Sequence, residues 1–206
     1  MMTKTLNQTP RGTTNRGVQS ETKNQIKKHI KDISCTELRE ILDIVELNNL
    51  HYIQLSNHVR DKVEVSFSLR HIQELLESNN LENLIIEVNV NFPNVNFSNV
   101  NFSNDNDSDP EDIRILVRDS EAVYTTITNK RTGQVSQIPC NMCFVYSLTS
   151  NRLITVYWNP ANDNHDSIDW NRYVDTDFYP YLRSLHARKE ASITRLSQAS
   201  ITRRYH

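Results

Sequence analysis

Apolar residues that recur every three or four positions predict helices in the first part of the chain. Ile26, Ile30 and Ile33 follow a polar N-terminal stretch, and their spacing favours a first helix. Ser34 offers a side-chain oxygen that can cap the start of a second helix over residues 35–49. Its apolar stripe consists of Leu38, Ile41, Leu42, Val45 and Leu47. A third helix is predicted over residues 68–80, where apolar side chains again share one face.

Short runs of branched and alternating residues predict strands in the second half. "LENLIIEVNV" ends at residue 90, and four further runs follow Pro110: "IRILVRD", "AVYTTITN", "VSQIPCNMCFVYSL" and "RLITVYWN". Strands this close in sequence favour an antiparallel meander. The expected fold is α+β, with two or three N-terminal helices packed on one face of a four- to five-stranded antiparallel sheet, and disordered basic termini.

Low-complexity segments mark the limits of the domain. Residues 1–20 have no periodicity and are expected to be a disordered leader, and residues 21–175 form a single α+β domain. Within that domain, residues 89–109 are read as an insertion, because three copies of Asn-Val-Asn-Phe-Pro/Ser are too short to be structural repeats. Residues 176–206 are expected to be a basic C-terminal tail, frayed or weakly helical.

Composition and charge narrow the functional classes. The 206 residues are 37% hydrophobic with a net charge of −2, and the mean hydropathy is −0.61. No apolar run reaches the length of a membrane span, and the N-terminus has no secretory signal, so a cytoplasmic location without membrane contact is expected. Both ends of the chain are basic. Basic arms often bind nucleic acid, but solvated tails are as often basic for solubility alone.

Missing motifs exclude several activities and cofactors. The chain has three glycines, and it has no dinucleotide-binding, phosphate-loop, zinc-protease or nucleophile-elbow motif. These absences argue against an ATPase, a Rossmann enzyme and a serine hydrolase. Cys140 and Cys143 have the spacing of a metal knuckle, but no second ligand pair is evident. They are interpreted as strand residues, so neither a metal nor another cofactor is expected.

His58 is the most informative candidate for catalysis. RNA cleavage without a metal needs a proton acceptor and cationic groups that stabilise the phosphate, and His58 stands among Arg60 and Lys62 just before the third helix. The competing interpretation is an exposed helix residue with solvated neighbours. His165, at the end of the last strand, is a second candidate that could pair with His58 as acid and base.

Strand alternation supplies the remaining site candidates. Arg114 and Arg118 fall on the face of "IRILVRD" opposite Ile113, Ile115 and Val117. Tyr124 and Thr126 share one face of the next run. A sheet face with Arg, Thr and Tyr suits RNA, but solvent-facing sheets have the same composition.

The segment "SNHVRDKVEVSFSLRHIQELLES" followed by "IRILVRD" resembles the small ribonuclease-type domains of the barnase, colicin D and RelE class. One branch of that class has Ser/Thr-x-His, downstream basic residues and then an amphipathic helix. Ser56 and His58 match this element, whereas Arg60 and Lys62 match it only in charge. The resemblance spans about residues 35–159 and implies an RNA-cleaving toxin, or a silent relative, from a phage or mobile element, with a protein inhibitor as partner.

Two functions are therefore carried forward. The first is RNA binding or metal-independent RNA cleavage, with His58 transferring the proton, Arg114 and Arg118 stabilising the phosphate, and Tyr124 or Thr126 orienting the substrate. The second is a non-enzymatic interaction module that binds a protein or nucleic acid. The sequence sets no oligomeric state.

Overall fold

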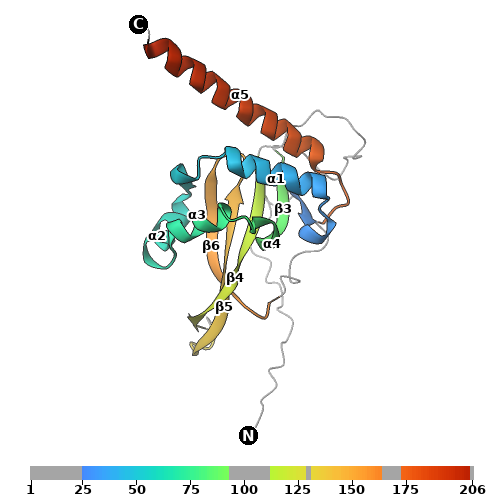
Figure 1. Cartoon of the computed structure of the whole chain (residues 1–206). Coiled ribbons are helices and arrows are strands. Elements are labelled where there is room, and N and C mark those ends of the chain that lie inside the picture. The colour runs from blue at the N-terminus through green and yellow to red at the C-terminus, as the bar shows by residue number, and fades with distance from the viewer. Residues whose placement is uncertain (1–24, 93–111, 129–130, 164–172, 205–206) are drawn as a thin grey trace.

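The computed structural model describes residues 25–92, 112–128, 131–163 and 173–204 and confirms an α+β fold (Figure 1). The strands are β1 (Gln25–His29), β2 (Gln54–Leu55), β3 (Ile85–Asn91), β4 (Asp112–Thr128), β5 (Val135–Ser147) and β6 (Arg152–Pro160). The helices are α1 (Cys35–Leu47), α2 (Asn57–Val65), α3 (Leu69–Leu76), α4 (Leu81–Leu84) and α5 (Tyr179–Arg204). Short 3₁₀ turns occupy Ile30–Asp32 and Leu50–Tyr52.

The strands of the described residues form one six-stranded mixed sheet in the order β1-β3-β4-β5-β6-β2. Neighbouring strands from β1 to β6 are antiparallel, whereas β2 is parallel to β6. The expected antiparallel meander is present as β3 to β6. The expected count of four or five strands was wrong, because β1 and β2 add one strand at each edge. The two residues of β2 are too few to show an alternating pattern in the sequence.

Residues 25–29 form a strand, although the isoleucine spacing favours a helix there. Ile26 and Lys28 are buried while their neighbours are half-buried, which is the two-residue period of a strand. The strand pairs with β3 from Gln25 opposite Asn91 to His29 opposite Glu87. Because the buried position 28 holds a lysine, the apolar residues alone do not show the two-residue period of a strand.

β4 is one 17-residue strand that contains "IRILVRD" and residues 122–128 of "AVYTTITN", which were predicted to be separate strands. Arg118 lies opposite Cys143 and Ala122 lies opposite Asn141, so four positions on β4 correspond to two on β5. The Asp-Ser-Glu run between them is therefore a bulge and not a turn. Beyond it, residues 122–128 and 135–139 continue as a two-stranded arm that projects from the sheet (Figure 1).

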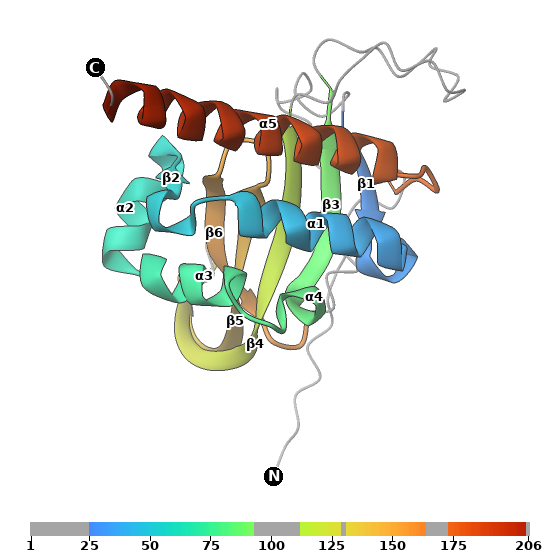
Figure 2. The ribbon, with the colours of Figure 1, turned by 45° about the horizontal axis from the view of Figure 1, so that its top comes forward.

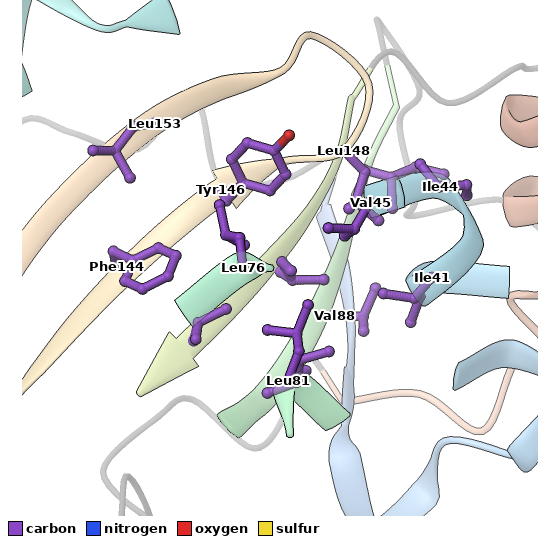
Figure 3. Packing of buried hydrophobic residues seen from close by; sticks show 14 of the residues in the cluster. Ile41, Ile44, Val45, Leu76, Leu81, Val88, Phe144, Tyr146, Leu148 and Leu153 are labelled. Atoms are coloured by element: carbon purple, nitrogen blue, oxygen red, sulfur yellow. The ribbon is translucent and has the colours of Figure 1, made fainter. Parts of the chain in front are cut away.

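The helices gather on one face of the sheet, with α1 lying across the strands and α5 alongside it (Figure 2). Side chains from α1, α3 and α4 meet those of β3 and β5 in one apolar cluster (Figure 3). Its members include Ile41, Ile44, Leu76, Leu81, Val88, Phe144 and Tyr146. The strand residues of the cluster alternate along β4, where Ile113, Ile115 and Val117 are fully buried. The opposite side of the sheet is called the second face below.

A buried carboxylate connects three parts of the fold at the start of α1. Glu37 is 0% exposed, and it forms a capping box with Ser34, whose backbone N–H donates to Glu37 Oε2 at 2.7 Å. Lys28 of β1 donates from Nζ to both carboxylate oxygens, at 2.9 and 3.1 Å. The N–H of Phe178, just before α5, donates to Oε1 at 2.7 Å. One side chain thus fixes β1, α1 and α5 together.

Of the two expectations for the C-terminal segment from residue 176, a frayed tail or a weak helix, the structure shows a helix, because residues 179–204 form the 26-residue helix α5. Phe178, Leu182 and Leu185 are buried in the core. Every side chain from residue 191 to 199 is exposed, and this part of α5 extends beyond the sheet (Figure 1). We call residues 191–199 the overhang. The overhang is rich in Ser, Thr and Arg, and only the first turns of α5 bury an apolar face. The sequence therefore lacks the apolar periodicity that would predict this long helix.

Some expectations lie outside the described residues. These include the leader 1–20 and nearly all of the insertion 89–109. Residues 89–92 of the insertion are described, and β3 ends at Asn91. Among the residues that the structure does describe, no helix is both long enough and apolar enough to cross a membrane.

We expect Glu37→Gln to destabilise the fold strongly, because it leaves the buried Lys28 ammonium without its counter-charge. Urea unfolding at pH 7 should show a loss of about 3–5 kcal/mol. The matched variant Glu46→Gln, an exposed position of the same helix, should change stability by less than about 0.5 kcal/mol.

The stabilisation by Glu37 should also depend on pH. Burial alone would raise the pKa of Glu37, but hydrogen bonds from Lys28, Ser34 and Phe178 together hold it below the ordinary value of 4.5. Its contribution is therefore complete above about pH 4.5 and is lost as the pH falls through the lower folded-state pKa. Unfolding measured from pH 7 to pH 3 should show a smaller acid loss in Glu37→Gln than in the wild type. Equal acid losses in the two proteins would contradict this account.

Candidate functional site

The second face of the sheet holds four of the predicted site residues. Arg114 and Arg118 alternate with the core residues of β4 and therefore point away from the helices. The bulge adds an even number of residues, so Tyr124 and Thr126 stay on the same side as the arginines. Tyr124 lies opposite Pro139, and Thr126 lies opposite Gln137. The structure thus brings these four residues onto one face along β4.

Both arginines of β4 already have protein partners. Arg114 donates from Nε to Asp112 Oδ2 at 2.6 Å. Arg118 donates from Nε and Nη2 to Asn141 Oδ1, at 3.2 and 2.7 Å, and from Nη2 and Nη1 to the carbonyls of Ala161 and Asp163, at 2.9 and 2.8 Å. The Arg118 guanidinium therefore fastens the turn after β6 to the sheet. This geometry supports a structural role for Arg118, and the phosphate-stabilising role expected from the sequence stays a prediction.

The bulge at the base of the arm is held by residues that the sequence did not single out. Asp119 is 6% exposed, and its Oδ2 lies 2.7 Å from Nε2 of His71 on α3. Asp119 Oδ1 accepts from the N–H of Glu121, and the Asp119 carbonyl accepts from Asn141 Nδ2 at 2.9 Å. The one sequence signal for such a bulge was the Asp-Ser-Glu run between two strand patterns. This run has no Gly or Pro that would favour a turn.

A cavity of about 360 Å³ opens beside this bulge. Its walls come from α4, the start of β3, the bulge and the end of β6. They include Asn83, Ile86, Arg118, Asp119, Ser120, Asn141 and Ala161. Cavities of this size can hold a small ligand, and here polar and apolar side chains line the wall together.

The arm beyond the bulge is exposed and carries a mixture of aromatic, apolar and hydroxyl side chains. Tyr124 is 78% exposed, Val135 is 61% exposed and Val123 is 44% exposed. Thr126 and Gln137, which face each other across the two strands, are exposed as well. No Asp or Glu occurs from residue 122 to residue 162. The arm is therefore free of negative side chains.

His58 lies on the helix-covered side of the sheet, away from both arginines. It stands in the first turn of α2, which packs through the buried Val59 into the core. The exposed His58 ring has Nε2 3.1 Å from Lys62 Nζ, and Lys62 also donates to the carbonyl of Val156 on β6 at 3.3 Å. β6 is two strands from β4, which corresponds to about 10 Å across a sheet. The structure therefore does not bring His58 together with Arg114 or Arg118.

His165 lies outside the described residues, so its predicted pairing with His58 stays a prediction. Cys140 and Cys143 lie within β5 and are both buried. Because they are three residues apart on a strand, they point to opposite faces and cannot share one ion. Burial raises the pKa of the Cys143 thiol to about 12.

One group among the described residues offers three atoms suited to metal binding. It consists of Glu40 and Asp43 on α1 and His186 on α5, whose ligand atoms lie within 4.8 Å of one another. Glu40 Oε1 already accepts from His186 Nδ1 and from Arg183 Nη1. These contacts, made through Glu40, join α1 to α5.

Comparisons with protein-family models, curated protein sequences and solved structures found no match to this chain.

We expect Arg118→Lys to destabilise the fold by about 1–3 kcal/mol, because lysine keeps the charge but loses the planar fork of donors. Hydrogen exchange at the Ala161 amide, which donates to Pro139, should become faster. The control Arg152→Lys changes an exposed arginine that has one bond to Gln54, and it should cost less than about 0.5 kcal/mol. Equal effects of the two substitutions would contradict the structural role of Arg118.

Proposed function

We propose that the protein binds single-stranded RNA through the arm and does not cleave it. The observation that carries this proposal is the combination, on one projecting hairpin, of the exposed ring of Tyr124 with a surface free of carboxylates. Proteins that bind single strands use aromatic rings on which bases stack, together with positive charge along the backbone path. The arm offers the aromatic ring, and Lys130 and Arg131 between its two strands supply the positive charge.

The chemistry of the arm favours unpaired bases over a duplex. A base stacks on a tyrosine ring when it is splayed out of a helix, as in single-stranded RNA. Thr126 and Gln137 lie on the same face as Tyr124 and supply hydroxyl and amide groups for base edges and the 2'-hydroxyl. Lys130 and Arg131 occupy the sequence between the two strands of the arm. Their charges would attract the phosphate backbone.

Binding without cleavage follows from the position of His58. Proton transfer to or from the 2'-hydroxyl requires a base within hydrogen-bonding reach of the same phosphate that the cations hold. His58 lies near the edge of β6 on the helix side, whereas Tyr124 and Thr126 lie on the second face. The resemblance to small ribonuclease-type domains therefore stays a prediction, and the arm supports the interaction module among the earlier alternatives.

Tyr124→Ala should weaken RNA binding, because it removes the proposed stacking platform. In fluorescence anisotropy with a labelled single-stranded RNA, the loss should be about 1–3 kcal/mol, or about 5- to 150-fold in affinity. Tyr52→Ala is the matched control, since Tyr52 is 76% exposed on the turn before β2, outside the arm. Equal affinities for wild type and Tyr124→Ala would contradict the proposal.

Salt dependence and cleavage provide two further readouts. The slope of log affinity against log salt should fall in magnitude by about 0.7 in Arg131→Gln, as expected for one lost phosphate contact on a single strand. Total RNA incubated with the protein in EDTA should stay intact, with wild type and with His58→Ala alike. RNA that is degraded by the wild type but not by His58→Ala would overturn the proposal in favour of a metal-independent ribonuclease.

A further inference from the structure

The apolar stripe of α5 continues past the part of the helix that packs on the domain. Leu182 and Leu185 are buried, and the same stripe runs on through Lys189 to Ile193 and Leu196. Lys189 is the last contact with the body, because its Nζ donates to Asn48 Oδ1 at 2.6 Å and to the Thr149 carbonyl at 3.1 Å. Beyond it, Ile193 is 43% exposed and Leu196 is 70% exposed.

A helix gains most of its stability from packing an amphipathic face, and a segment of three or four turns is marginal by itself in water. The nine residues of the overhang are shorter still, about two and a half turns, and their side chains are all exposed. Large apolar side chains exposed in line with a core stripe are typical of a surface that another molecule covers.

A groove lined by apolar and acidic side chains, which could receive the apolar and basic overhang, lies elsewhere on the same chain. It has a volume of about 530 Å³ and runs between α1 and the corner formed by α3 and α4. Its apolar residues are Leu42, Val45, Leu50, Leu76 and Leu81. Its rim carries Glu46, Glu77 and Glu82, and His51 is its one basic side chain. Asn48, Asn49, Ser78 and Asn79 complete the lining, so the groove combines apolar, neutral polar and acidic side chains.

The charge of the overhang is complementary to this rim. Arg188 precedes the overhang and Arg195 lies within it, on one flank of the apolar stripe. No acidic residue occurs after Glu190. Long arginine side chains can extend from the flank of a docked helix to carboxylates at the edge of a groove.

The overhang of the same chain does not fill the groove, because its side chains from residue 191 to residue 199 are exposed. Side chains of α5 bond to Glu40 of α1 and to Asn48, which is one of the residues that line the groove. Leu42 follows Glu40 by two residues, which places it about 200° around the helix, on the opposite side of α1. A helix in the groove must come from another molecule.

We propose that the overhang of one chain docks into the acidic groove of a second copy. Because each copy has one overhang and one groove, two copies can exchange their helices reciprocally about a two-fold axis. This proposal does not depend on RNA binding, and the oligomeric state tests it without RNA.

The experiment is sedimentation velocity of the full chain over a range of concentrations. The wild type should form a dimer, and Leu196→Glu should raise the dimer dissociation constant at least about tenfold by placing a charge on the docked stripe. Ala187→Glu adds the same charge to an exposed position of α5 before the overhang, on the side away from the stripe, and should leave the dissociation constant unchanged. A wild type that stays monomeric throughout would overturn the proposal.

Charge reversal tests the groove separately. Glu77→Arg and Arg195→Glu should each weaken the dimer, and the double variant should recover most of the loss because it restores opposite charges across the contact. Glu77 and Arg195 are both exposed, so the fold should survive, as circular dichroism can verify. A dimer that tolerates both Leu196→Glu and Glu77→Arg would use another surface and would equally overturn the proposal.

Discussion

The fold depends on a carboxylate that is buried and yet fully satisfied. Glu37 holds the first strand, the first helix and the start of the last helix at one point, through Lys28, its own capping box and the N–H of Phe178. A charge out of water is costly unless each of its oxygens is hydrogen-bonded. That requirement fixes the relative positions of segments more than 140 residues apart. The apolar cluster then fills the space that these segments enclose.

A second buried carboxylate organises the other face of the sheet in the same manner. Glu87 on β3 accepts from Lys27 Nζ and Asn89 Nδ2 at Oε1, and from the Tyr173 hydroxyl at Oε2. Burial would raise the pKa of Glu87, but the charge of Lys27 and these hydrogen bonds lower it. One face of the sheet is therefore apolar and covered by helices, while the other is built from paired charges and amides. This division leaves the arm as the part of the second face that is most exposed.

The sequence predicted the structural features that follow from short patterns of apolar and polar residues. Alternation in "IRILVRD" placed Ile113, Ile115 and Val117 on the core side, and they are fully buried there. Prediction from these patterns failed where a polar residue takes a buried position, as Lys28 does in β1. It also failed where a strand continues through a bulge, as β4 does at Asp119. The relation between His58 and the arginines could not be predicted, since it depends on which side of the sheet α2 covers. The contact between His71 and Asp119 joins residues 48 positions apart and has no local signature.

The even count of inserted residues in the bulge has a consequence for how this hairpin can vary. Because Arg118 to Ala122 spans four positions against two on the partner strand, the side chains beyond the bulge keep their orientation. Removal or addition of a single residue there would turn Tyr124 toward the helix layer and present Val123 in its place. Changes in length at this point therefore preserve the outward surface of the arm when they come in pairs.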